Sequence, residues 1–384
     1  MAFLEADITE ELYVELPDGY RDSPNQVGRL QKTMYGLMHA GLLWPKNFGG
    51  ELIVKELERS QADPCVFRRK NLGKVVVIIV VYVDDLLVLS ETKQDEHQAL
   101  EDLRSSFPIK DLGEISNYLG CHITRDRKAR TVTFDQQHYA QTVTERFEIR
   151  KTSVIPVPTG KSPLSKADGP QNDAEIAEMH GIPYREAVGA LMWVANMTGP
   201  GLAYTAHMLA KFDDNPGPEH WKAVMKALQY LKRTASLGVT YGGATEDMKL
   251  SAWVDADHAS CPDTRRSVSG GAVMLGGGAI SWFSRAQRIT APATSESEYV
   301  ALAEIANELR FLRQVNAFIV LPIDYNIRVH EDNEGAIKMS ENRFSSRRTR
   351  HIDVKHDMVR DTVDGGIVRV EYSMSNRENS MRTY

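Results

Sequence analysis

The sequence has few cysteines and no long apolar run, and each absence excludes a class of protein. The 384 residues include only three cysteines, which form no closely spaced pair: Cys65, Cys121 and Cys261. This usage excludes a disulfide scaffold or a zinc module and predicts a reducing compartment. The apolar run Val75–Val83 ends at Asp84 and is too short to span a membrane. The acidic segment Met1–Glu10 has no basic region, so no signal peptide is expected, and we expect a cytoplasmic or nuclear protein without membrane contact.

Basic charge is also not in excess. The net charge is −6, with 42% hydrophobic and 26% charged residues, which are ordinary globular values. A nucleic-acid site would therefore have to be a local basic surface. The length predicts two or three domains, but no oligomeric state.

The order of the expected elements indicates a mixed α/β (α+β) protein. Residues 1 to about 125 are expected to alternate short strands and helices, including helices over 42–59 and 94–107. Residues 151–183 contain five prolines and predict a linker. Residues 184–245 are expected to be mainly helical. Residues 246–384 predict three strands, a long helix over 296–317, a strand, two helices and a last strand, which is a layered α/β pattern.

The most informative local feature is Tyr82-Val83-Asp84-Asp85. The apolar runs on either side of this segment predict a hairpin with two acids at its tip. An Asp-Asp pair in a hairpin is often only a solvated turn. Two adjacent carboxylates can instead hold a divalent cation against nucleotide phosphates, with Mg²⁺ the first choice and Mn²⁺ the second.

A second set of acids stands at the ends of expected elements. Asp255 and Asp257 end a strand, Glu298 begins the long helix, and Asp332 closes a later strand. Glu298 could belong to a capping box with Ser295, and Asp332 could merely cap the next helix. Convergence of Asp255, Glu298 and Asp332 would instead build a Mg²⁺ site for phosphodiester hydrolysis.

A basic stretch near the carboxyl end is a candidate nucleic-acid contact. Such a charge run is usually a solvated face, but beside a phosphodiester-cleaving site it could grip the backbone. Its candidate residues are Arg347, Arg348, Arg350 and His351.

Several motifs together resemble the reverse transcriptase and RNase H part of the Pol polyprotein of copia-type LTR retrotransposons. The resemblance covers nearly the whole chain. The motifs are Glu10–Tyr20, Leu30–Leu37, Asp63–Phe67, Tyr82–Asp85, Lys110–Gly113 with Tyr118–Gly120, Tyr184–Met192, Asp255–Asp257, Asp263–Gly270, Ser295–Ala301, Asp332–Ile337 and Arg350–Val354.

The resemblance implies a reverse-transcriptase palm over 1–150, thumb or connection helices over 184–245, and an RNase H-like mixed sheet over 246–384. It implies that Asp84 and Asp85 are acids of the polymerase hairpin, and that Tyr35 belongs to a motif contacting dNTP and template. It also implies that Asp255, Glu298 and Asp332 are metal-binding acids of the RNase H site. The partners would be an RNA–DNA hybrid or a primer–template, with dNTP bound only by a competent polymerase.

The sequence also departs from the family pattern. The family's first polymerase aspartate lies before the segment that matches Ala2-Phe3-Leu4, so we expect that acid and the fingers to be missing. A Lys and an Arg are replaced within Met38–Leu42, and Met381 stands where the fourth RNase H acid is expected. We therefore expect little polymerase activity, and possible RNase H activity.

Two other interpretations remain open. One is a non-catalytic nucleic-acid-binding remnant of a decayed element, which would bind hybrid without turnover. The other, an unrelated Mg²⁺ phosphotransferase, is weaker because Gly276-Gly277-Gly278 is not followed by an expected helix.

Overall fold

The computed structural model describes residues 7–8, 10–21, 23, 26–37, 40–150, 163–243, 249–319, 326–341 and 353–374. The chain divides into two compact units, which are described separately. Unit 1 comprises 1–113 with 311–322, and unit 2 comprises 114–310 with 323–384. The division falls at Gly113, earlier in the chain than the boundary expected near residue 150.

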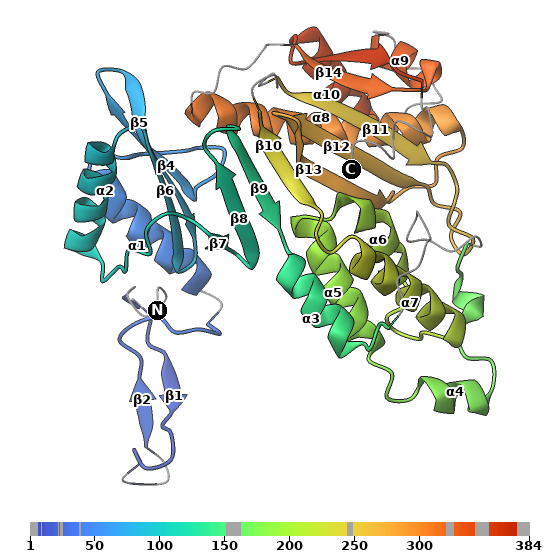
Figure 1. Cartoon of the computed structure of the whole chain (residues 1–384), viewed down its shortest axis with the longest axis horizontal. Helices are drawn as coiled ribbons and strands as arrows, with labels where there is room; N and C mark the ends of the chain where they lie inside the picture. The colour runs from blue at the N-terminus through green and yellow to red at the C-terminus, as the bar shows by residue number, and fades with distance from the viewer. Residues whose placement is uncertain are drawn as a thin grey trace. The chain divides into compact units, whose positions relative to one another are not determined.

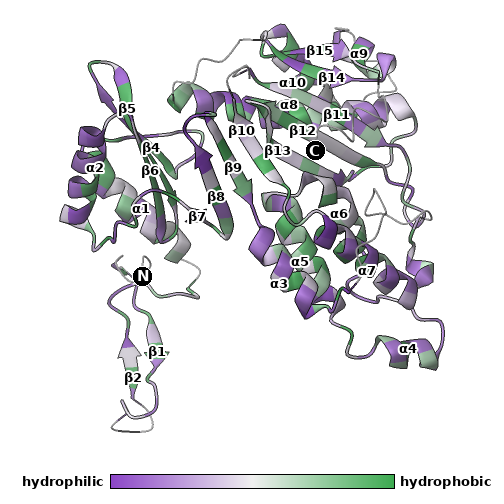
Figure 2. Cartoon of the chain, viewed as in Figure 1, coloured by the Kyte–Doolittle hydropathy of each residue, from purple (hydrophilic) through white to green (hydrophobic). Residues whose placement is uncertain are grey.

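Unit 1 is built around an antiparallel sheet of order β3-β4-β5-β6. These strands are Glu58–Arg59, Val66–Asn71, Lys74–Tyr82 and Asp85–Ser90. Alternating side chains of β5 pack with helices α1 (Ala40–Val54) and α2 (Lys93–Ser106) around a core that includes Phe48, Phe67 and Leu103. Figure 2 shows the hydrophobic colour concentrated in the strands of this sheet. The central hairpin therefore stands on a buried apolar support.

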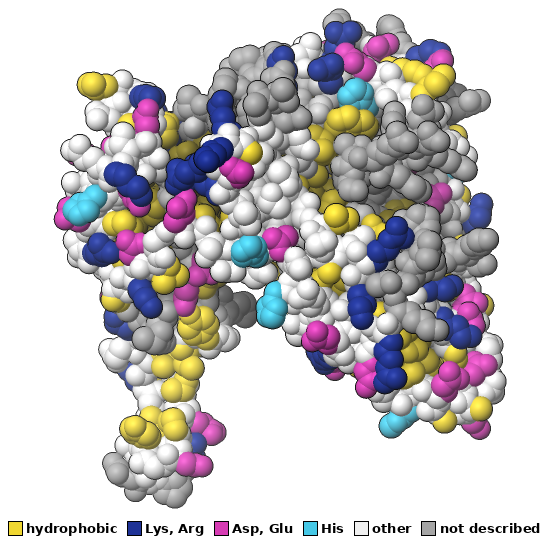
Figure 3. Space-filling view, in the orientation of Figure 1, with side chains coloured by type: hydrophobic (Ala, Val, Ile, Leu, Met, Phe, Trp, Pro, Cys, Tyr) yellow, Lys and Arg dark blue, Asp and Glu magenta, His cyan; other side chains and the backbone are white. Residues whose placement is uncertain are grey.

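A two-stranded ribbon, β1 (Tyr13–Glu15) and β2 (Val27–Arg29), precedes this sheet in the chain. Exposed apolar side chains, including Tyr13 and Val27, lie along it. Figure 3 shows hydrophobic patches in yellow over this ribbon. These short strands lie within the segment for which the sequence predicted short strands alternating with helices.

The first part of unit 2 is an antiparallel sheet of order β10-β9-β8-β7 with a cluster of helices. The strands, in chain order, are Asn117–Tyr118, Cys121–Asp126, Thr131–Asp135 and Gly238–Gly242. The main helices are α3 (Gln137–Arg146), α5 (Tyr184–Met197), α6 (Ala203–Ala210) and α7 (Pro218–Arg233). Fully buried residues on α5 and α7, among them Leu191 and Leu228, make these helices share one core.

The second part of unit 2 is a five-stranded mixed sheet of order β13-β12-β11-β14-β15 (Figure 1). The strands β11 (Ser251–Asp257), β12 (Val268–Leu275) and β13 (Gly278–Ala286) are antiparallel neighbours, whereas β14 (Ile327–Glu331) and β15 (Val368–Tyr372) add in parallel. The long helix α8 (Thr294–Ile319) connects β13 to β14, and α9 (Glu334–Glu341) and α10 (Asp353–Asp364) connect β14 to β15. The mixed sheet and its connecting helices confirm the expected α/β layer pattern.

Two expected elements differ from the structure. The helix expected over 42–59 ends at Val54, because Glu56 takes a positive φ of 63° and the chain then forms β3. The segment expected as a linker contains a 3₁₀ turn, η2 (Lys166–Asp168), and helix α4 (Asp173–Met179). Side-chain caps explain η2 and α4, since Ser165 and Asn172 accept hydrogen bonds from backbone amides in the first turns of these two elements. Among the described helices, none is both long and apolar enough to cross a membrane.

Candidate active site

The hairpin between β5 and β6 presents the adjacent acids of unit 1. Tyr82 pairs with Asp85, so Val83 and Asp84 form a two-residue turn. Val83 has a φ of 53°, a left-handed conformation that is costly for a β-branched side chain. The indole Nε1 of Trp44 donates a hydrogen bond of 3.0 Å to the Val83 carbonyl and holds the turn from the α1 side. The turn confirms the predicted hairpin. Strained backbone conformations of this kind cluster at functional sites, so the strain at Val83 makes the turn a candidate site.

Tyr35 lies against this turn. Its hydroxyl group donates to the Asp84 carboxylate, with oxygen distances of 2.8 and 2.9 Å. Both residues are exposed. The residue that the sequence suggested for nucleic-acid contact is thus positioned beside one of the two hairpin acids.

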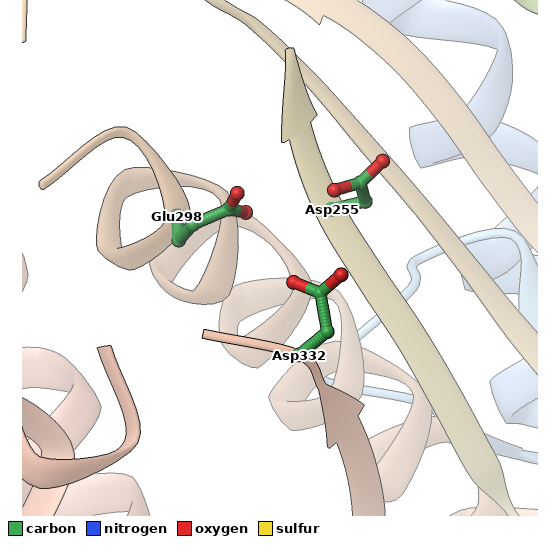
Figure 4. Close-up of side chains that lie close together, drawn as sticks. All are labelled: Asp255, Glu298 and Asp332. Atoms are coloured by element: carbon green, nitrogen blue, oxygen red, sulfur yellow. The ribbon is translucent and has the colours of Figure 1, made fainter. Parts of the chain in front are cut away.

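The three acids predicted in the carboxy-terminal region come together in unit 2. Asp255 lies on β11, Glu298 in the first turns of α8, and Asp332 directly after β14. Because β11 and β14 are parallel neighbours, Asp255 and Asp332 lie toward the same end of the sheet. One ligand oxygen from each acid lies within 4.8 Å of the others. Figure 4 shows the three carboxylates pointing toward a common space.

Helix capping does not explain Asp332. The α9 amino end is capped by its neighbour, since Asn333 Oδ1 accepts a hydrogen bond of 3.0 Å from the Ala336 backbone amide. Asp332 therefore remains available to the cluster. Glu298 likewise directs its carboxylate toward Asp255 and Asp332 (Figure 4).

The cluster is electrostatically unfavourable without a cation. Glu298 is only 4% exposed, and its Oε2 has no hydrogen-bond partner within the described part of the chain. Burial, together with the charges of Glu331, Asp255 and Asp332, raises the pKa of Glu298 to about 9. Burial and the Asp332 carboxylate also raise the pKa of Asp255. Both shifts have the cause expected when like charges share a poorly solvated site.

One further acid was not predicted from the sequence. Glu331 is 1% exposed, and burial raises its pKa to about 7. Its Oε1 accepts a hydrogen bond of 3.0 Å from the Asn333 amide, while its Oε2 has no partner among the described residues. The alternation of Ile327 and Val329 along β14 was the available signal, because it places Glu331 on the buried face.

The carboxylate oxygens of this cluster fit a hard divalent cation. Carboxylate oxygens are the ligands that Mg²⁺ and Mn²⁺ prefer, and the unpartnered buried Oε2 of Glu298 is an orphaned acceptor at the site. Over the described residues, no third acid or histidine joins Asp84 and Asp85 in a comparable group. The carboxy-terminal acids of unit 2 thus form the more complete arrangement of ligands.

Some predicted residues lie outside the described ranges. These are the basic candidates Arg347, Arg348, Arg350 and His351, and also Met381. Asp257, by contrast, is described, and its carboxylate accepts a long hydrogen bond of 3.5 Å from the Tyr204 hydroxyl.

Sequence comparison places the chain among retrotransposon proteins. The family described as reverse transcriptase (RNA-dependent DNA polymerase) matches residues 1–161. The retrovirus-related Pol polyprotein from transposon TNT 1-94 of Nicotiana tabacum is 34% identical over 98% of this chain and 28% of its own length. The corresponding polyprotein from transposon RE1 of Arabidopsis thaliana is 28% identical over 96% of this chain and 25% of its own length. The chain thus spans about a quarter of the length of these curated relatives.

Structure comparison finds partial similarity to a foamy viral protease-reverse transcriptase in complex with RNA/DNA hybrid. It is 12% identical, with a TM-score of 0.48, over 90% of this chain and 39% of its own. The LC11-RNase H1 structure is 12% identical, with a TM-score of 0.27, over 35% of this chain and 91% of its own.

Proposed function

Because this chain belongs with the copia-type retrotransposon Pol proteins and corresponds to their reverse transcriptase and RNase H region, we propose that its Asp255–Glu298–Asp332 cluster hydrolyses RNA. The substrate is the RNA strand of an RNA–DNA hybrid, and the cofactor is Mg²⁺, with Mn²⁺ as a substitute.

One observation carries this proposal. Ligand oxygens from three separate elements lie within 4.8 Å of one another, and one of the contributing acids is buried with an orphaned oxygen. Uncompensated charges in such a place cost several kcal/mol, on the order expected for burial of an ion. A site of this kind is better explained by a bound cation than by helix capping or solvated acids.

A divalent cation, when bound, would polarise the phosphate and lower the pKa of a water molecule. The protein's own contribution is positional. Asp255 and Asp332, from parallel neighbouring strands, hold their carboxylates at one end of the sheet. Glu298, fixed in the first turns of α8, supplies the third carboxylate from the side of the helix. We assign hybrid recognition to helix shape and 2′-hydroxyl contacts in preference to base sequence.

For the hairpin of unit 1, we propose little or no DNA synthesis by this chain alone. Asp84 and Asp85 offer two carboxylates, and no third acid lies with them among the residues that the structure describes. Metal-assisted phosphoryl transfer depends on complete preorganised charge stabilisation, and the loss of one group there typically costs about 3–4 kcal/mol. Primer extension with Mg²⁺ or Mn²⁺ and dNTP tests this, and robust synthesis would contradict it.

The hydrolase is tested with an end-labelled RNA–DNA hybrid and purified protein in Mg²⁺. Asp332→Asn should lower the cleavage rate by about 100-fold or more, since it removes one ligand charge from the site. Glu334→Gln is the matched control, because Glu334 is two positions away and pairs with Lys338 at the surface. Unchanged cleavage in Asp332→Asn means that Asp332 is wrongly assigned. Salt-dependent hybrid binding without metal-dependent cleavage would select the alternative function, a non-catalytic nucleic-acid-binding remnant.

A further inference from the structure

We propose that Glu331, the residue before Asp332, is a fourth carboxylate of the cation site, which strengthens cation binding without being one of the three converging ligands. This inference rests on the proposed function, because it assumes that the Asp255–Glu298–Asp332 cluster binds a divalent cation. It concerns a residue that the sequence motifs did not single out.

The position of Glu331 is fixed by the sheet. It is the last residue of β14, where it pairs with Tyr372 of β15, and its carbonyl accepts a hydrogen bond of 3.0 Å from the Ser373 amide. Its side chain follows Ile327 and Val329 on the buried face of the strand. A carboxylate at such a position cannot reach bulk water by rotation, so its charge and its hydrogen bonds have to be satisfied within the protein.

Only one oxygen of the Glu331 carboxylate accepts a hydrogen bond from the described residues. Glu331 Oε1 accepts from the Asn333 amide at 3.0 Å, which anchors the group at the turn that carries Asp332. Its Oε2 is buried without a hydrogen-bond partner in the described part of the chain, as is the Oε2 of Glu298. Two orphaned buried carboxylate oxygens at one site are a strong indication of a missing positive charge.

Electrostatics connects the two acids. Among the charged neighbours of Glu298, Glu331 raises the pKa of Glu298 the most, ahead of Asp255 and Asp332. Within the described ranges, none of the four acids forms an ion pair with Lys, Arg or His. The positive charge that this cluster requires therefore has to come from outside the described side chains, and a divalent cation between the three converging ligands supplies it.

The role of Glu331 follows from its absence from the group of converging ligand oxygens. The group of converging oxygens consists of Asp255, Glu298 and Asp332, so Glu331 is a positioning and charge-supplying residue. Outer carboxylates of this kind orient the direct ligands and tune their affinity, and their loss typically weakens metal binding by about 10–100-fold.

The test is a titration of the full chain with Mn²⁺ alone, by calorimetry and by thermal unfolding with and without the ion. Glu331→Gln keeps the acceptor for the Asn333 amide and removes only the charge. We expect it to weaken Mn²⁺ binding about 10-fold and to raise the melting temperature of the metal-free protein. Glu331→Asp, which keeps the charge on a shorter side chain, should bind more tightly than Glu331→Gln. Glu334→Gln should match the wild type in both measurements.

The outcomes separate this inference from the proposed function. If the wild-type chain binds no Mn²⁺, or if Asp332→Asn binds it normally, the metal site itself is wrong. If the wild type binds and Asp332→Asn does not, but Glu331→Gln binds with wild-type affinity, only the role of Glu331 is overturned. A Glu331→Gln protein that loses stability without the ion would show that the residue is merely structural, which also overturns the inference.

Discussion

The Tyr35 hydroxyl group donates a hydrogen bond to Asp84 across 49 positions of sequence. The contact joins the segment before α1 to the strained turn between β5 and β6. It gives an exposed tyrosine a defined place beside the hairpin acids, and it can be tested by stability alone.

Removing this hydroxyl group should have a small effect that depends on Asp84. We expect Tyr35→Phe to lower the free energy of unfolding by no more than about 1 kcal/mol, because both groups are solvated. Denaturant unfolding measures the change, and Tyr13→Phe, at a position that is 56% exposed on β1, is the control. In an Asp84→Ala background the cost should shrink, and an equal cost in both backgrounds would argue against the hydrogen bond.

The turn residue Val83 should be replaceable with a gain in stability. Its φ of 53° is unfavourable for valine, while asparagine tolerates this region. Val83→Asn is therefore expected to raise the free energy of unfolding by about 1 kcal/mol. The control is Val81→Asn on the preceding strand β5, which is 8% exposed and should destabilise unit 1. A loss of stability in Val83→Asn would mean that the turn depends on the valine side chain.

The acid cluster predicts that the metal-free protein loses stability as pH rises. Glu298 and Glu331 have pKa values raised from 4.5 to about 9 and about 7, so the folded state binds protons more tightly than the unfolded state. Their contribution to stability is complete below the unfolded pKa and is lost as pH rises through these folded values. Thermal unfolding in a chelator should thus give a melting temperature that falls between about pH 5 and pH 9.

Two comparisons check the origin of this fall in melting temperature with pH. Glu298→Gln should remove most of the fall, and saturating Mg²⁺ should offset the loss of stability at high pH in the wild type. A slope that is the same in Glu298→Gln and the wild type would assign the effect to other groups.

The core of unit 1 supports the hairpin, and its disruption should be costly. Leu103 on α2 is 1% exposed within the core that contains Phe67 and Ile79. Leu103→Ala should lower the free energy of unfolding by about 2–5 kcal/mol. Leu112→Ala, at a position that is 82% exposed, should change it little. Equal effects would contradict the assignment of Leu103 to the core.

Much of the carboxy-terminal fold could be predicted from the sequence, because its elements are long and periodic. The helix expected over 296–317 is α8 (Thr294–Ile319), and the two helices expected after the next strand are α9 and α10. The convergence of Asp255, Glu298 and Asp332 was predicted from the ends of elements, and the structure brings these residues together. The hairpin at Asp84 followed from the apolar runs on its two sides.

What the sequence did not predict depends on tertiary context. The burial of Glu331 depends on the parallel pairing of β14 with β11 and β15, which local composition does not encode. The end of α1 at Val54 depends on the left-handed conformation of Glu56, a non-glycine residue for which no turn signal is evident. The contact of Tyr35 with Asp84 joins residues that no local periodicity could connect.

The placement of the acids on both sides of the α8–β14 connection has a practical consequence. A break between Ile319 and Ile327 would leave Asp255 and Glu298 on one piece and Asp332 on the other. Neither piece alone would carry the full set of oxygens, whereas reassembly of the two would recreate it. Cation capture could thus serve as a split reporter, because a signal would arise only when β14 has docked beside β11.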